Sequence, residues 1–179
     1  MTKRWVPRLW RRLLPQERVF VCKWFGQSQG QWLAARVRIG QRRWGDTRRA
    51  LCLNGGWMSF PKAAFDGQSM HHALRLEHPS VAGIFAHELL HELQRRQGEP
   101  VTAQAFWLQC QWLVQRKNPY FYSCQRSASG LLRQFWLANV EQQGQMWEDY
   151  VQSAVAGQAL ASHAWLPVVV RAGRLRRRK

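Results

Sequence analysis

The stretch FAHELLHEL, residues 85–93, contains the letters H-E-x-x-H as His87, Glu88 and His91. At ~100° per residue of an α-helix, His87 and His91 lie ~40° apart, so both imidazoles can reach one metal ion. Glu88 lies beside that face, and the leucines with Ala86 lie opposite, where they can pack on a core. This pattern is typical of a zinc helix, in which the carboxylate takes a proton from water. Two histidines on a solvated helix face would give the same letters.

The flanking residues predict where this helix begins and ends. Ser80 is a typical helix cap, and Arg95-Arg96 before Gly98 is typical of a helix end near Gln97. Apolar periodicity predicts further helices over about 101–116, from about 129, and over about 138–155.

The first half of the chain has shorter apolar runs. Residues 4–14 predict a basic amphipathic helix that ends at Pro15. Runs rich in β-formers favour strands at 19–22 and 36–39, and a hairpin over 51–60 with its turn at Asn54-Gly55-Gly56. Strands followed by helices indicate an α+β fold, with a small antiparallel sheet and a helical second half.

A catalytic zinc requires a third protein ligand. Gln94 and Gln97 stand where the elongated motif H-E-x-x-H-x-x-G-x-x-H would have its glycine and third histidine, so the ligand must come from elsewhere. The predicted helix 138–155 places Glu141, Gln145 and Glu148 on one face. Two facing helices, one with two histidines and one with a glutamate, form the glutamate-zincin arrangement. Glu141 and Glu148 are both candidates, and a solvated acidic face is the alternative explanation.

The two helices resemble a known family. FAHELLHELQ and, about fifty residues later, ANVEQQGQMWEDYV are similar to motifs of bacterial zinc metallopeptidases that occur beside type VI secretion spike proteins and related contractile injection systems. That family pairs a helix of the form H-E-L-T-H-V-W-Q with a later helix of the form N-x-E-Q-Q-A-E-I-x-x-D-Y. The resemblance covers roughly residues 10–153. The matching residues are His87, Glu88, His91 and Gln94 in the first helix, and Glu141, Gln142, Gln143, Asp149 and Tyr150 in the second.

The resemblance implies a Zn²⁺ ion on His87 and His91, with Glu141 favoured as the third ligand and Glu148 in reserve. Gln145 stands where the family has its second glutamate, and Gly144 where it has alanine. Gln145 can still hydrogen-bond a ligand histidine, but without a charge. Gln94, which matches the family's glutamine, is a second candidate for orienting the ligands.

Two tyrosines of the stretch NPYFYSCQ are candidates for a catalytic hydroxyl. Tyr120 or Tyr122 could stabilise a developing oxyanion, and packing in a loop or core is the alternative explanation.

Composition leaves several kinds of partner open. The chain of 179 residues carries 27 Lys and Arg against 10 Asp and Glu, a net charge of +17, which suits an acidic protein, an anionic surface or nucleic acid. Tryptophans among the arginines suit nucleic acid weakly, because no recognition motif accompanies them. Four scattered cysteines favour free thiols. No apolar run is long enough for a transmembrane helix, and no secretory signal is predicted.

These features predict a basic arm at 1–18, a zincin-like domain at 19–155 and a tail at 156–179 that ends in a basic run.

The function expected is hydrolysis of peptide bonds in a peptide or protein through a zinc-activated water, with Glu88 as general base. The alternative is a non-catalytic basic module on the same fold that docks on a secretion apparatus, an acidic protein or nucleic acid. A third possibility is an effector that combines both properties. We expect the chain to be cytoplasmic as synthesised, with export without a cleavable signal left open.

Overall fold

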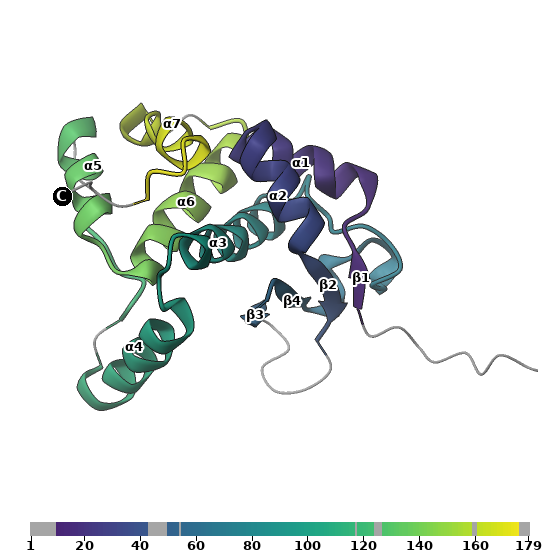
Figure 1. Ribbon diagram of the computed structural model, residues 1–179, viewed down its shortest axis with the longest axis horizontal. Helices are drawn as coiled ribbons and strands as arrows, with labels where there is room; N and C mark the ends of the chain where they lie inside the picture. The colour runs from purple at the N-terminus through teal and green to yellow at the C-terminus, as the bar shows by residue number, and fades with distance from the viewer. Residues whose placement is uncertain are drawn as a thin grey trace, which may run out of the picture.

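The computed structural model describes residues 10–42, 50–53, 55–116, 118–123, 127–158 and 161–175. Within these residues a small four-stranded sheet lies on one side of a larger helical body (Figure 1), so the α+β prediction is confirmed. The elements are, in order, β1 (Trp10–Arg12), α1 (Pro15–Phe25), α2 (Gln27–Arg36), β2 (Arg38–Gln41), β3 (Leu51–Leu53), β4 (Trp57–Phe60), α3 (Pro79–Arg96), α4 (Val101–Gln115), α5 (Ala128–Leu137), α6 (Val140–Val155) and α7 (Leu166–Arg171).

The sheet is mixed rather than antiparallel, which corrects the sequence prediction. Its order is β1-β2-β4-β3, and β2 and β4 run parallel while the two outer pairs are antiparallel. The predicted hairpin over 51–60 is present as β3 and β4, with Cys52 opposite Met58. β3 lies at the edge of the sheet, and β4 returns antiparallel to it. β4 therefore lies between β3 and β2 and runs parallel to β2.

The strand predicted at 19–22 is wrong, because these residues lie in α1. Pro15 begins this helix rather than ending one, and the carboxylate of Glu17 accepts a hydrogen bond from the backbone N–H of Leu14 at 2.8 Å. Proline is well suited to the first position of a helix, where its missing N–H leaves no bond unmade. The helix start at Pro15 and Glu17 therefore outweighs the β-branched composition of residues 19–22, which alone favours a strand. The face that α1 buries carries Phe20, Val21, Trp24 and Phe25.

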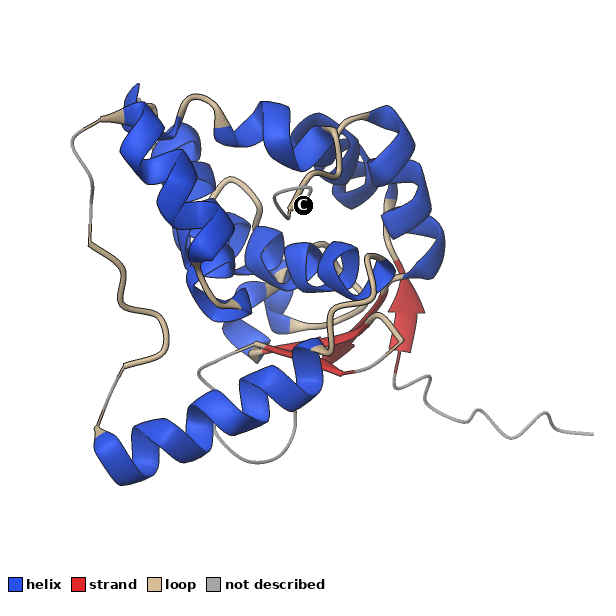
Figure 2. Ribbon diagram, turned by 60° about the vertical axis from the view of Figure 1, so that its left-hand side comes forward, coloured by secondary structure: helices blue, strands red, loops and turns tan. Residues whose placement is uncertain are grey.

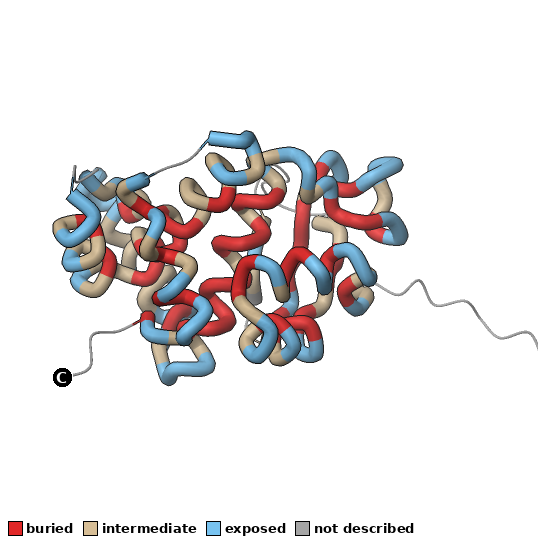
Figure 3. Tube along the Cα trace, turned by 90° about the horizontal axis from the view of Figure 1, so that it is seen from above, coloured by how far each residue is buried: buried red, intermediate tan, exposed pale blue. Residues whose placement is uncertain are grey.

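The helices α3 and α6 pack against each other at the centre of the molecule, and the residues on their facing sides are buried (Figure 3). The helix predicted around residues 80–97 is present as α3. The predicted cap is wrong, because the helix begins at Pro79 with His78 at the cap position, and Ser80 lies inside its first turn. Its apolar residues Phe85, Leu89 and Leu90 are fully buried against the core. The helix α6 contributes Trp147 and Val151 to the same core, as its predicted buried face requires.

The core extends beyond the predicted domain bounds of 19–155. Leu13 in the predicted arm and Leu166, Val170 and Leu175 in the predicted tail all belong to the buried cluster. The predicted helix over 4–14 is wrong at residues 10–12, which form β1, and its first part falls outside the described residues. Cys22 and Cys110 are free thiols, the Sγ atom of Cys52 contacts the side chains of Glu92 and Arg95, and Cys124 lies outside the described residues. In the described parts of the chain, no helix combines the length and hydropathy that crossing a bilayer needs.

Candidate metal centre

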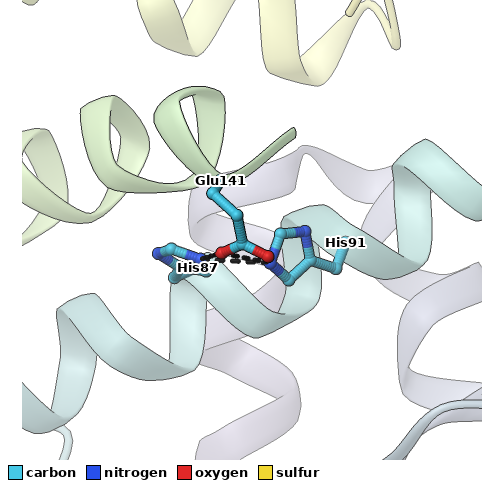
Figure 4. Close-up of side chains that lie close together, drawn as sticks. All are labelled: His87, His91 and Glu141. Carbon is cyan, nitrogen blue, oxygen red and sulfur yellow. Dashed lines mark hydrogen bonds and ion pairs between the residues drawn. The ribbon is translucent and has the colours of Figure 1, made fainter. Parts of the chain in front are cut away.

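Three predicted ligands meet at the crossing of α3 and α6. His87 and His91 lie one turn apart in the middle of α3, and Glu141 points at them from the first turn of α6 (Figure 4). The start of α6 is fixed by Asn139, whose side chain accepts a hydrogen bond from the backbone N–H of Gln142 at 2.8 Å. This cap sets where the helix begins, and therefore which residue of its first turn faces α3.

The spacing of the three ligand atoms fits a tetrahedral metal ion. His87 Nε2 lies 3.1 Å from His91 Nε2, and the Oε2 atom of Glu141 lies 3.4 Å and 3.6 Å from these two nitrogens. Ligands placed ~2.0–2.1 Å from a tetrahedral zinc are ~3.3–3.4 Å from one another. All three side chains are buried, and they form a group able to hold a metal ion. Three protein ligands leave one position of the tetrahedron for water or substrate, as in catalytic zinc sites.

Glu148, the reserve ligand, holds a different position. Its Oε2 atom lies 2.9 Å from Nδ1 of His87, on the side of the ring away from Glu141 and His91. A proton on Nδ1, donated to Glu148, leaves the Nε2 lone pair for the metal. Gln152 in turn donates a hydrogen bond to Oε1 of Glu148 at 2.9 Å. Glu148 therefore holds the ring of His87 from the side opposite His91 and Glu141.

His91 is oriented by a chain of glutamines. Its Nδ1 atom lies 2.7 Å from Oε1 of Gln94, and the amide of Gln94 donates to Oε1 of Gln143 at 2.8 Å. Gln143 donates to the backbone carbonyls of Phe135 and Leu175 at 2.8 Å and 3.1 Å. Gln94 thus contacts His91, and the backbone anchors the chain of glutamines at its far end. Buried polar groups linked in this way fix the ring more firmly than a single bond.

The carboxylates shift the ionisation of the site. Burial alone would lower the pKa of His87, but its contacts with Glu141 and Glu148 raise the pKa to about 10. Burial would raise the pKa of Glu141, and the hydrogen bonds with the two histidines hold it well below its usual range. The side chains alone therefore hold a proton between His87 and Glu141 at neutral pH. A metal ion has to displace this proton.

Glu88 lines the cleft that opens beside these ligands. The cleft has a volume of about 660 Å³ and includes residues of β3, α3, α4 and α6, together with Tyr120 from the loop after α4. Burial raises the pKa of the Glu88 carboxyl above its usual range, and the nearby histidines oppose the shift. The ring of Tyr120 lies 6.3 Å from that of His87, so its hydroxyl remains a candidate for contact with a substrate.

Two predicted residues have other partners. Gln145 lines the cleft, but its amide donates to Oδ1 of Asp149 at 2.8 Å rather than to a ligand histidine. The hydroxyl of Tyr122 donates to the other oxygen of Asp149, and Tyr122 is not among the residues that line the cleft. The orienting role proposed for Gln145 belongs to Glu148, and Tyr120 is the better placed tyrosine.

Gly144 allows α6 to approach the ring of His87 closely. A Cβ atom at this position would lie 2.5 Å from Nε2 of His87, far inside the contact distance of carbon and nitrogen. From the sequence, Gly144 is visible only as a departure from the family's alanine. Gln143 is among the residues that match the family, but no contact was predicted for it. A polar residue at helical spacing between Val140 and Trp147 interrupts the buried stripe and is a usable signal.

No family model, curated protein or solved structure matches the chain. The resemblance to metallopeptidases linked to secretion systems therefore stays a prediction, as do the partners and the location inferred from it. The group of His87, His91 and Glu141 that could hold a metal ion rests on its own geometry.

Proposed function

We propose that the protein is a zinc-dependent metallopeptidase that hydrolyses peptide bonds in the cleft beside α3. The observation that carries the proposal is the convergence of His87, His91 and Glu141 within metal-binding distance of one another. Both histidines have their Nδ1 atoms held by other side chains, which leaves both Nε2 atoms directed at one point. Structural ion pairs do not require this arrangement, whereas metal sites do.

Each residue of the site has a role in this reaction. Zinc, when bound by the three ligands, supplies a Lewis acid that polarises the substrate carbonyl and acidifies water. Glu88 lies in the cleft beside the ligands and accepts the proton that the water loses. The water oxygen joins the carbonyl carbon, the C–N bond breaks, and Glu88 returns the proton to the leaving nitrogen. Tyr120 lines the same space, and its hydroxyl can donate a hydrogen bond to the carbonyl oxygen as negative charge develops there.

The sheet edge supports a peptide as the substrate. Among the described strands β3 is the last in the sheet order, and its residues Leu51 and Cys52 line the cleft. An extended peptide can add to a strand at a sheet edge through backbone hydrogen bonds, which places its carbonyl groups along the strand. A peptide held in this way would pass between β3 and the metal ligands.

Metal content tests the ligand set. We expect about one zinc ion per wild-type chain after zinc loading, and none retained by His91→Ala or Glu141→Ala. Glu148→Gln keeps a hydrogen-bonding group at His87, so it should still bind zinc at saturation, with about 10–100-fold lower affinity. Loss of zinc at saturation in Glu148→Gln but not in Glu141→Ala would make Glu148 the third ligand instead.

Hydrolysis tests the reaction. Zinc-loaded wild type is compared with zinc-loaded Glu88→Gln on an unfolded protein substrate, with fragments identified by mass spectrometry. We expect the variant to keep its zinc and lose cleavage by about 100-fold or more, because the general base is gone. Equal cleavage by both proteins would exclude this role of Glu88. Zinc binding with no cleavage by the wild type would favour the non-catalytic binding module.

A further inference from the structure

The helix α4 (Val101–Gln115) differs from every other long helix of the described chain in how little of it is covered. It projects from the body below α3 and α6 (Figure 2) and has only Val101 fully buried. Its sequence VTAQAFWLQCQWLVQ contains no charged residue. A helix with apolar residues around its whole circumference normally packs against something. The large apolar side chains that it exposes are Phe106, Trp107, Trp112, Leu113 and Val114.

One side of α4 forms a wall of the metal cleft. Thr102, Ala105, Phe106 and Gln109 line it, and their spacing of three and four residues places them on a single helix face. Phe106 is the largest of the four and is 71% exposed, so its ring is open to a ligand in the cleft.

The walls that face the same space are also apolar. Ile84 of α3 and Ala50 and Leu51 beside the sheet edge line the cleft together with Val101. The carboxylates in the cleft belong to the metal centre. Of the two arginines that line it, Arg95 is paired with the buried carboxylate of Glu92 and Arg42 follows β2, so neither lies on α4. A charged substrate side chain placed against Phe106 would lose its hydration without gaining an ionic partner on α4. An apolar side chain there would instead cover the exposed ring.

We propose that α4 selects the substrate, and that the preferred substrate is an extended polypeptide segment with a large apolar side chain beside the scissile bond. Phe106 is the residue that determines this preference, with Ala105 and Ile84 completing the apolar surface. The proposal rests on the proposed peptidase function and specifies its substrate class. An apolar side chain of this kind is buried in a folded protein, so unfolded chains and flexible segments are the natural source of such substrates.

A pair of quenched fluorescent peptides tests the selection. Both consist of glycine, serine and asparagine, and one carries a single phenylalanine where the other has asparagine. We expect zinc-loaded wild type to cleave the phenylalanine peptide with at least tenfold higher kcat/KM. Phe106→Ala should lower kcat/KM for that peptide about tenfold and change the asparagine peptide by less than about twofold.

Val114→Ala is the matched control. Val114 lies on the same helix, is 82% exposed, and is not among the residues that line the cleft. The substitution Val114→Ala should leave kcat/KM for both peptides unchanged. An equal loss for both peptides in Phe106→Ala, or no loss for either, would overturn the proposal while leaving the peptidase function intact.

A binding measurement separates failure of this inference from failure of the function. Fluorescence anisotropy with labelled forms of the two peptides is measured on zinc-loaded Glu88→Gln, with and without Phe106→Ala. Tighter binding of the phenylalanine peptide that weakens about tenfold in the double variant supports the role of α4, even if no peptide is cleaved by the wild type. Equal binding of the two peptides, or no binding of either, overturns it.

Discussion

The crossing of α3 and α6 and the helix α4 border the same cleft but are built in opposite ways. Where α3 meets α6, the leucines of α3 are fully buried and the polar side chains around the histidines are hydrogen-bonded to one another. In α4 only the first residue is fully buried, and Leu113 and Val114 are 63% and 82% exposed. The crossing of α3 and α6 is held by packing and hydrogen bonds on all sides, whereas α4 is attached to the body mainly at its N-terminal end.

The difference corresponds to what each region has to achieve. Metal ligands must be held to within ~0.5 Å, which requires packing and hydrogen bonds around every ring. A wall that only contacts apolar side chains tolerates shifts of its own, because dispersion and the removal of apolar surface from water have little directionality. Weakly covered segments also open more readily, as substrate-binding segments have to. The chemistry therefore belongs to the rigid pair, and we assign recognition to the loosely held helix.

Gly144→Ala is the substitution with the largest expected effect on the rigid pair. Helix propensity alone favours alanine by ~1 kcal/mol. The new Cβ would lie 2.5 Å from Nε2 of His87, so we expect the steric overlap to dominate and displace the ring. Zinc affinity should fall by about 100-fold or more, with the helical content retained. Elemental analysis and circular dichroism on the same samples measure both.

Gly30→Ala is the control for this substitution. A Cβ at Gly30 of α2 would lie 2.6 Å from Cα of Cys22, a comparable overlap between α1 and α2 that involves no metal ligand. We expect it to lower the melting temperature and leave one zinc-binding site of wild-type affinity. If both variants lost zinc equally, the loss in Gly144→Ala would report general loosening of the fold rather than the position of His87.

The same truncation in the two regions measures their difference in stability. Leu89→Ala removes a side chain that is fully buried in α3, and should lower the free energy of unfolding by ~2–5 kcal/mol. Leu113→Ala removes a side chain that is 63% exposed in α4, and should change it by less than ~0.5 kcal/mol. Urea unfolding of both variants in the same excess of zinc gives the two values. A large loss in Leu113→Ala would mean that α4 is covered in solution, and the comparison would no longer hold.

The centre of the site was predictable because it is local in the sequence. The spacing of His87 and His91 and the single acidic face of the later helix follow from helical periodicity alone. The choice between Glu141 and Glu148 as third ligand could not be predicted from periodicity, because it depends on how α6 is rotated and where it crosses α3. The orienting contacts of Gln94 and Gln143 depend on the same crossing. Periodicity places side chains on a face, but it does not say which atom they meet.

The fold was predictable where helix signals agreed and was missed where they competed. The helices α3 to α6 have long apolar stripes and clear ends, and they lie close to the predicted ranges, whereas α7 falls in the predicted tail and was missed. Over residues 19–22 the β-branched composition favoured a strand, but Pro15 and Glu17 start a helix whose apolar face is buried. The parallel pairing of β2 and β4 joins strands that are distant in sequence, and short strands carry no signal for their partner.

The link between the two regions gives the smallest expected effect, and it depends on pH. Tyr122, in the loop after α4, donates its hydroxyl to Asp149 of α6, and Nε2 of His163 lies 3.4 Å from that hydroxyl. His163 is 2% exposed, and burial lowers its pKa below the usual 6.5, with Asp149 opposing the shift. As pH falls below about 6.5, the unfolded chain takes up a proton that the folded chain resists, so this contribution to stability is present above that pH and lost below it.

His163→Gln cannot take up this proton and is the variant that isolates the contribution. We expect wild type to lose stability relative to His163→Gln between pH 7.5 and pH 5, by no more than ~1.4 kcal/mol per pH unit, since one proton is involved. Melting temperatures of both proteins, measured in parallel across this range, give the difference free of other titrating groups. A difference that stays constant would show that His163 binds its proton equally well in the folded and the unfolded chain. In that case the attachment of the loosely held helix would not respond to acid.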